Sequence, residues 1–221
     1  MHRLFLWDID GTILLAKGSG KRAMNRSFWE LFHIPDAFDN IQMTGGLDMN
    51  FVQAAFANHQ IPLDQIAPFF EAYYGNLQQE LNNMTVTLMP GVIELLDKIE
   101  QTDFCFNSIA TGNMERSARM KLEVFNLNRY FPVGGFCRSA GERYEVLLDG
   151  IRNAENYYQT NFTTGQVTVI GDTVEDIRAA RKINASVIAV ATGPTSYEQL
   201  ASEKPDLLLL NLQDYNHIKM N

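Results

Sequence analysis

The chain has 221 residues, of which 46% are hydrophobic and 20% are charged, and it carries a formal net charge of −8. This composition is typical of a soluble globular protein, and the length allows one large domain or a core with a smaller second domain. The negative charge argues against duplex nucleic acid or an anionic membrane surface as a partner, because both would repel the protein.

The first apolar run is short and ends in acidic residues. Leu4–Trp7 leads directly into Asp8-Ile9-Asp10-Gly11-Thr12, which predicts a buried strand whose tip carries two carboxylates. Ligands bind at strand tips in open parallel sheets, and two like charges there need a cation or a proton to compensate them. The run is too short for a membrane span and shows no signal-peptide pattern, so we expect a cytoplasmic protein.

Residues 16–86 are predicted to form an all-helical insert. Three amphipathic helices follow one another with no good strand between them, and Pro35 and Pro62 separate them. Their apolar faces carry Met24, Phe28, Leu31 and Phe32, then Leu47, Phe51, Ala54 and Ala55, then Ile66, Phe69, Phe70, Tyr73, Tyr74, Leu77 and Leu81. We expect linkers near 14–19 and 85–90, a core made of residues 1–15 and 87–221, and a small cap domain at 16–86.

The second half of the chain alternates between strand and helix. Strands are predicted near 104–110, 131–137, 167–170, 187–191 and 207–210, with amphipathic helices between them. This alternation predicts an α/β fold: a three-layer Rossmann-like core with a mostly parallel sheet and right-handed crossovers. Cys105 and Cys137 both fall in predicted strands, so we expect buried free thiols rather than a disulfide.

Polar residues also follow two of the later strands. Thr111-Gly112-Asn113 comes after the strand near 104–110, and Gly171-Asp172 comes after the strand near 167–170, with Asp176 in the next helix. Backbone N–H groups at such a junction of strand and helix form an anion site, and Asn113 is a reasonable N-cap for the helix after it.

These three segments, in this order, resemble motifs I, II and IV of the haloacid dehalogenase superfamily. The first is its DxDGT motif, the second is a strand that ends in Ser or Thr, and the third is GDxxxD. The resemblance implies a phosphatase of the type with a C1 helical cap. Asp8 and Thr111 are separated by 103 positions, which leaves room for such a cap between the first two motifs.

The resemblance also implies roles for the motif residues. Asp8 would be the nucleophile that forms an aspartyl-phosphate, and Asp10 would be the general acid and base. Asp8 and Asp172 would bind Mg²⁺ through their side chains and Asp10 through its carbonyl, while Asp176 would help through water or from the second layer. Thr111 and Gly112 would bind the phosphoryl group.

Motif III of the family usually supplies a lysine, and here its position is less obvious. Lys121 is the only lysine between Thr111 and Asp172, but it lies inside the predicted helix after motif II, where we expect a solvated side chain. We therefore assign the role to Arg143, because arginine can bridge phosphate and carboxylate. Arg138 is the second candidate.

The predicted function is Mg²⁺-dependent hydrolysis of a small phosphorylated metabolite, with nucleic acid and membrane excluded as partners. The cap segment Thr44-Gly45-Gly46-Leu47-Asp48 matches the Gly-Arg-Thr-Asp pattern of phosphoglycolate phosphatases only through Gly45 and Asp48. Phosphoglycolate is therefore in doubt as the substrate, and Asp48 is either a cap-site residue or a helix-start residue. A phosphomutase of the β-phosphoglucomutase type and a non-catalytic phosphate-binding protein remain alternatives, and the sequence does not indicate an oligomeric state.

One further segment resembles a phosphate-binding loop only superficially. Gly18-Ser19-Gly20-Lys21-Arg22 lacks the first glycine of a Walker A motif, and Arg22 stands where Ser or Thr is required. We expect this segment to be a flexible entry to the cap.

Overall fold

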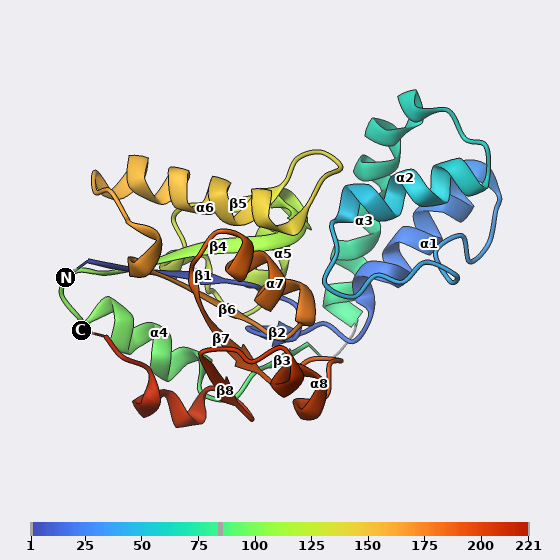
Figure 1. Ribbon diagram of the computed structural model, residues 1–221. Helices are drawn as coiled ribbons and strands as arrows, with labels where there is room; N and C mark the ends of the chain where they lie inside the picture. The colour runs from blue at the N-terminus through green and yellow to red at the C-terminus, as the bar shows by residue number, and fades with distance from the viewer. Residues whose placement is uncertain (1, 84–85, 221) are drawn as a thin grey trace.

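The computed structural model describes residues 2–83 and 86–220, and in this part of the chain the core is a six-stranded parallel sheet. The strand order is β5-β4-β1-β6-β7-β8 (Figure 1). The strands are β1 (Arg3–Trp7), β4 (Cys105–Met114), β5 (Gly134–Cys137), β6 (Val167–Gly171), β7 (Ser186–Val190) and β8 (Leu207–Leu209). The predicted α/β class is confirmed.

Helices cover both faces of this sheet. The helices of the core are α4 (Val92–Glu100), α5 (Glu115–Glu123), α6 (Arg143–Tyr158), α7 (Val174–Lys182) and α8 (Tyr197–Ser202). Side chains alternate along β1, so Phe5 and Trp7 share one apolar core with α4 and α5, while Leu4 and Leu6 share the other with α6 and α7. Because both faces are buried, the strands are apolar throughout, which is typical of a parallel sheet between helices.

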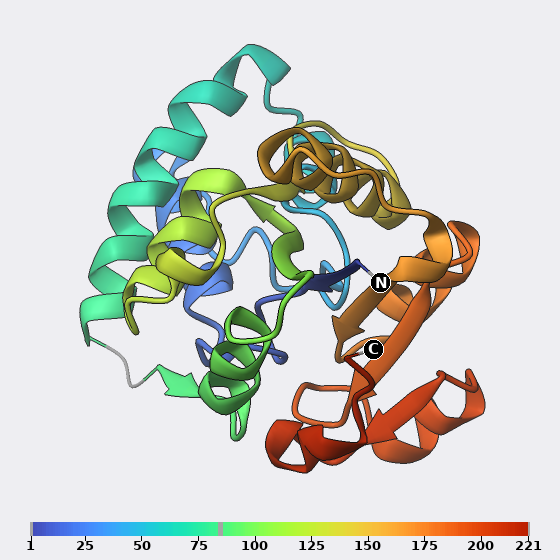
Figure 2. The same ribbon diagram turned by 90° about the vertical axis from the view of Figure 1, so that its left-hand side faces the viewer.

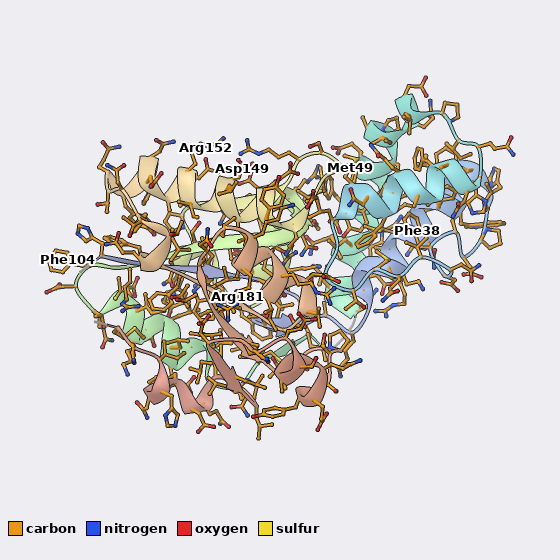
Figure 3. The ribbon with its side chains drawn as sticks, in the orientation of Figure 1. Phe38, Met49, Phe104, Asp149, Arg152 and Arg181 are labelled. Carbon is orange, nitrogen blue, oxygen red and sulfur yellow. The ribbon has the colours of Figure 1, made fainter. Side chains whose placement is uncertain are left out.

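The helical insert, α1–α3, lies between the first strand of the core sheet and β4. Its helices are α1 (Ser19–Phe32), α2 (Asp48–Asn58) and α3 (Ile66–Asn83), and they form a lobe at one end of the sheet (Figure 1). Phe28, Phe38, Phe56 and Phe69 are fully buried together inside it, and Phe38 lies within this lobe in Figure 3. Most of the apolar faces that the sequence predicted on these helices are therefore buried in the insert, but the prediction was wrong for Leu31 and Ala54, which are exposed.

A small antiparallel pair connects the insert to the core. β2 (Leu14–Leu15) pairs with β3 (Thr87–Leu88), which brings the two ends of the insert together. The sequence did not predict this pair, since strands this short give no periodic signal. The second predicted linker begins at Thr85, which lies outside the described residues.

The insert also contacts the core beyond this pair. α3 packs against α5, and Figure 2 shows the two helices side by side. At the other end of the junction Met49 of α2 lies next to the core (Figure 3), where its amide donates to Sγ of Cys137 at 3.4 Å. Short 3₁₀ turns complete the chain at Leu63–Gln65, Asn128–Tyr130, Thr164–Gln166 and Leu212–His217.

Three smaller expectations also have clear outcomes. Cys105 and Cys137 are buried and free, as predicted. Among the described residues, no helix is long and apolar enough to cross a membrane. Gly18–Arg22 is not a flexible entry: Ser19 is the first residue of α1, so Ser19–Arg22 forms the first turn of that helix.

Candidate active site

The three motif segments meet at the carboxyl edge of the sheet. Trp7 of β1 pairs with Ile109 of β4 on one side and with Ile170 of β6 on the other. Asp8, Thr111 and Asp172 lie just beyond these paired positions, and all three are buried. The register of the central strands thus brings Asp8 close to Thr111 and Asp172, which both lie more than 100 positions after it in the chain.

Three buried carboxylates form the centre of the site. Oxygen atoms of Asp8, Asp172 and Asp176 all lie within 4.8 Å of one another. Burial raises the pKa of Asp8 to about 6; Arg143 opposes the rise, and the carboxylates of Asp176 and Asp10 add to it. Burial, with the charges of Asp8 and Asp176, also raises the pKa of Asp172 well above its ordinary value. The cluster is therefore short of positive charge.

Arg143, the first residue of α6, is the cation inside this cluster. Its Nη2 atom lies 2.6 Å from Oδ1 of Asp8 and 2.8 Å from Oδ1 of Asp176, and its Nε atom lies 3.1 Å from the same oxygen of Asp176. Its side chain is only 8% exposed. The structure thus places Arg143, our assigned motif III residue, against the predicted nucleophile, whereas Arg138 is exposed.

Asp172 keeps one oxygen unsatisfied. Its Oδ1 atom accepts a hydrogen bond from the Thr12 hydroxyl at 2.9 Å, but its buried Oδ2 atom has no hydrogen-bond partner among the described residues. A Cβ on Gly11 would lie 2.3 Å from this Oδ2, and one on Gly193 would lie 1.6 Å from it. Only glycine fits at these two positions, because the backbone passes close to this orphaned carboxylate oxygen. An all-oxygen donor set of this kind fits a hard divalent cation.

Both carboxylate oxygens of Asp176 have hydrogen-bond partners. Its Oδ1 atom binds Arg143, and its Oδ2 atom accepts from the amide and the hydroxyl of Thr173 at 3.1 Å and 2.6 Å. Thr173 is also the N-cap of α7. Asp176 therefore holds both Arg143 and the start of α7 in place.

Lys121 is buried at this site, so the expectation of a solvated side chain was wrong. Its residue is only 4% exposed, and its Nζ atom lies 2.5 Å from Oδ2 of Asp10 and 2.7 Å from Oδ1 of Asn113. The side-chain Nδ2 atom of Asn113 donates to the same oxygen of Asp10 at 2.8 Å. Helical spacing could have indicated this, since Lys121 follows Ala118 by three positions and precedes Leu122, so it shares their inward face.

The start of α5 also differs from the expectation. Asn113 is not its N-cap: β4 continues to Met114, with an irregular register between Ala110 and Met114, and α5 begins at Glu115 with Met114 as N-cap. The Met114 amide donates to Oδ2 of Asp48 at 2.9 Å. Thr111 and Gly112 therefore lie in the irregular end of the strand, and a carboxylate of the insert occupies the helix N-terminus.

Asp48 thus connects the insert to the core. It is the first residue of α2, it is 7% exposed, and its Oδ2 atom also lies 3.5 Å from the Ser117 hydroxyl. Burial raises the pKa of Asp48 to about 6, although the Lys121 ammonium opposes this. The prediction of a helix-start residue is confirmed, because Asp48 begins α2, and its role as a cap-site residue stays a prediction.

Replacing Asp48 with asparagine should make thermal stability less dependent on pH. Because the pKa of Asp48 rises from 3.8 to about 6 on folding, its protonated form is favoured in the folded protein. The protonated Asp48 carboxyl therefore contributes fully to the free energy of unfolding below about pH 4, and this contribution is lost as the pH rises through about 6. Relative to wild type, Asp48→Asn should therefore gain stability between about pH 4 and pH 7, on the order of 2–3 kcal/mol. Thermal unfolding of both proteins across this range measures the gain, and a difference that stays constant with pH would contradict it.

A cavity of about 270 Å³ lies between the insert and the sheet edge. Asp8, Asp10, Thr111, Lys121 and Arg143 line its core side. The insert approaches closely here: a Cβ at position 112 would lie 1.9 Å from the carbonyl oxygen of Gly46. Only glycine fits at Gly112, so the end of β4 and the loop before α2 enclose the site together.

The chain is similar to a known family of hydrolases and to several known proteins. The sequence model of the family described as haloacid dehalogenase-like hydrolase matches residues 5–190. The chain is 24% identical to a phosphoglycolate phosphatase of Agrobacterium fabrum over 93% of this chain and 87% of that protein. It is 25% identical to a phosphoglycolate phosphatase of Pasteurella multocida over 92% of each. The crystal structure of CbbY from Rhodobacter sphaeroides in complex with phosphate is similar with a TM-score of 0.75 and 19% identity, over 96% of this chain and 95% of that one.

Proposed function

Because the chain belongs to the haloacid dehalogenase-like hydrolases, we propose that it hydrolyses the phosphomonoester of a small metabolite with Mg²⁺ as cofactor. The observation that carries this proposal is the buried cluster of Asp8, Asp172 and Asp176 at the sheet edge, with Asp10 beside it on the same cavity. Two relatives named phosphoglycolate phosphatase support a small phosphorylated substrate. The helical insert at residues 16–86 would act as the cap over the cavity.

In the proposed reaction Asp8 is the nucleophile. One of its carboxylate oxygens attacks phosphorus, the bond between phosphorus and the ester oxygen breaks, and the leaving alkoxide takes a proton from Asp10. In the second step Asp10 takes a proton from water as that water attacks the aspartyl-phosphate, which releases inorganic phosphate and restores Asp8. The two steps replace one difficult attack of water on a phosphate dianion.

The remaining residues position these two. Arg143 lies 2.6 Å from Asp8, so it would orient the nucleophile and offer its other N–H groups to the phosphoryl oxygens. Thr111 and Gly112 would supply further donors to these oxygens. Asp48 makes its hydrogen bonds to the core at Met114 and Ser117, which favours a docking role for the insert over direct contact with substrate.

The metal would be held by Asp8 and Asp172. The buried Oδ2 atom of Asp172, which has no hydrogen-bond partner among the described residues, supports this assignment. By resemblance to the family, the carbonyl of Asp10 would be a further ligand, and Asp176 would support the site through Arg143 and Thr173. When bound, Mg²⁺ would supply the positive charge that lets a carboxylate approach a phosphate dianion.

Removal of the metal tests this proposal directly. We expect the wild-type protein to release inorganic phosphate from p-nitrophenyl phosphate in Mg²⁺, and we expect dialysis against EDTA to lower the rate by about 100-fold or more. Re-addition of Mg²⁺ should restore the rate. Absence of phosphate release from a broad panel of phosphate esters would contradict the proposal, as would a rate that EDTA does not change. Conversion of a hexose 1-phosphate to its isomer without free phosphate would favour the phosphomutase alternative.

A further inference from the structure

The first turn of α1 opens onto the same cavity as the predicted nucleophile. Lys17, Gly18, Ser19, Gly20 and Lys21 all line it. α1 has 14 residues, so its N-terminus carries a substantial partial positive charge. The segment that the sequence placed in a flexible entry is therefore an ordered wall of the site.

Among the described residues, no side chain caps this helix start. Its N-cap is Gly18 at a φ of 76°, its first turn contains no acidic residue, and the Ser19 amide donates to the Ala16 carbonyl at 2.9 Å. The first intrahelical bond runs from the Arg22 amide to the Gly18 carbonyl at 3.1 Å. The amides of Gly20 and Lys21 precede that bond and have no acceptor within the helix.

Ser19 provides a second and independent observation. It is 0% exposed, it lines the cavity, and its hydroxyl has no hydrogen-bond partner among the described residues. A buried hydroxyl without a partner is costly, and one that faces a cavity is explained by a group that binds there. A Cβ on Gly20 would lie 3.7 Å from the Tyr73 hydroxyl, so a second hydroxyl is close to the same turn.

The charges at this end of the cavity favour an anion. Lys17 is exposed at the cavity wall, and its carbonyl accepts from Nη1 of Arg22 at 2.6 Å, which holds the turn. The Lys21 ammonium lies 3.3 Å from Oδ1 of Asp39, so Lys21 would contribute mainly its amide. The nearby carboxylates are already bound, Asp10 by Lys121 and Asp48 by Met114.

We propose that this turn is a second anion subsite, formed by the Ser19 hydroxyl, the Gly20 and Lys21 amides and the Lys17 ammonium. The inference rests on the proposed phosphatase function and deepens it: the substrate would be a phosphomonoester whose alcohol carries a further anionic group, a carboxylate or a second phosphate. That group binds at α1 while the phosphoryl group lies at Asp8.

Three small phosphate esters of similar size test this subsite. They are 2-hydroxyethyl phosphate, which is neutral at its far end, 2-phosphoglycolate, which ends in a carboxylate, and ethane-1,2-diyl bisphosphate, which ends in a second phosphate. We expect at least one anionic ester to have a KM about tenfold or more below that of 2-hydroxyethyl phosphate. The ester with the lower KM identifies the anion.

Substitutions in the turn assign the preference to this site. Gly20→Asp places a carboxylate on the first turn, and we expect it to raise KM for the preferred anionic ester about tenfold or more. It should change KM for 2-hydroxyethyl phosphate by less than about threefold. Gly75→Asp is the matched control, since it places the same carboxylate on α3 at an exposed glycine where an added Cβ would meet no described atom within 4 Å, and it should change neither. Ser19→Ala should raise KM for the anionic ester alone.

Binding measured without turnover separates this inference from the proposed function. In an Asp8→Asn background with Mg²⁺, calorimetric titration should show tighter binding of the preferred anionic ester than of 2-hydroxyethyl phosphate, and Gly20→Asp should remove the difference. Equal binding of all three esters would overturn the subsite even if the enzyme is an active phosphatase. A difference that persists in Gly20→Asp would overturn it as well. A silent wild type that still shows the Gly20-dependent difference would refute the phosphatase proposal and support the subsite.

Discussion

Asp8→Asn should reduce phosphate release by about 10⁴-fold or more while the protein remains folded. Asparagine has nearly the same shape, but its amide oxygen does not attack phosphorus. Stability should not fall, because burial raises the pKa of Asp8 to about 6. At pH 7 and above Asp8 is ionised in the folded protein although burial favours its protonated form, and this lowers the free energy of unfolding. A neutral amide at this position removes that destabilisation. Arg143 keeps its second partner, Asp176, in this variant.

Initial rates with p-nitrophenyl phosphate and thermal unfolding measure both parts of this prediction. Asp149→Asn is the matched control, since Asp149 lies on the outer side of α6 and its ion-pair partner among the described residues is Arg152 (Figure 3). Acid quench followed by mass spectrometry should detect a phosphorylated peptide that contains Asp8 in the wild type. If Asp8→Asn keeps a tenth of the wild-type rate, another group is the nucleophile.

The sheet and the acidic centre could be predicted because they depend on local pattern. Apolar runs that end in Asp8, Thr111 and Asp172 mark strands, and parallel strands end at one edge, so these residues had to meet. Arg143 was assigned to motif III from the resemblance to the family and not from local pattern. Burial of Cys105 and Cys137 followed from the same strand pattern.

Contacts between the insert and the core could not be predicted in the same way. The carboxylate of Asp48 binds the Met114 amide 66 positions away, and no local signal indicates which helix start a carboxylate will reach. The irregular end of β4 also has no periodic signature, so the start of α5 was predicted too early. The first turn of α1 was misread because its glycines favour a loop by composition, whereas packing of α1 against α3 makes it a helix.

Lys121 shows the same limit most clearly, and its replacement has the second largest expected effect. The sequence places Lys121 on the inward face of its helix, but a lysine is rarely buried unless a carboxylate pairs with it. The carboxylate that pairs with it belongs to Asp10, which lies 111 positions earlier in the chain. Lys121 and Asn113 both bind Oδ2 of Asp10, so they fix the side chain by one oxygen, while 42% of the Asp10 side chain remains exposed.

Lys121→Met should therefore lower kcat/KM most where the leaving group needs a proton, because kcat/KM reports the attack of Asp8 on the ester and not the later hydrolysis of the aspartyl-phosphate. An alkyl phosphate releases a strongly basic alkoxide, so loss of a well-placed Asp10 should cost about 100-fold in kcat/KM. p-Nitrophenyl phosphate releases a stable anion, so its kcat/KM should fall only a few-fold.

The ratio of the two losses distinguishes positioning of Asp10 from general damage. Lys204→Met, a change at an exposed lysine, should leave both rates unchanged, and Lys121→Arg should restore part of the alkyl phosphate rate because it keeps a donor for Asp10. Removal of a buried cation leaves Asp10 and Asn113 with one partner fewer, so some loss of thermal stability is expected in Lys121→Met in any case. If both esters lose kcat/KM equally, Lys121 serves the fold and not the proton transfer, because misplacement of the general acid in the first step cannot affect a leaving group that does not need one.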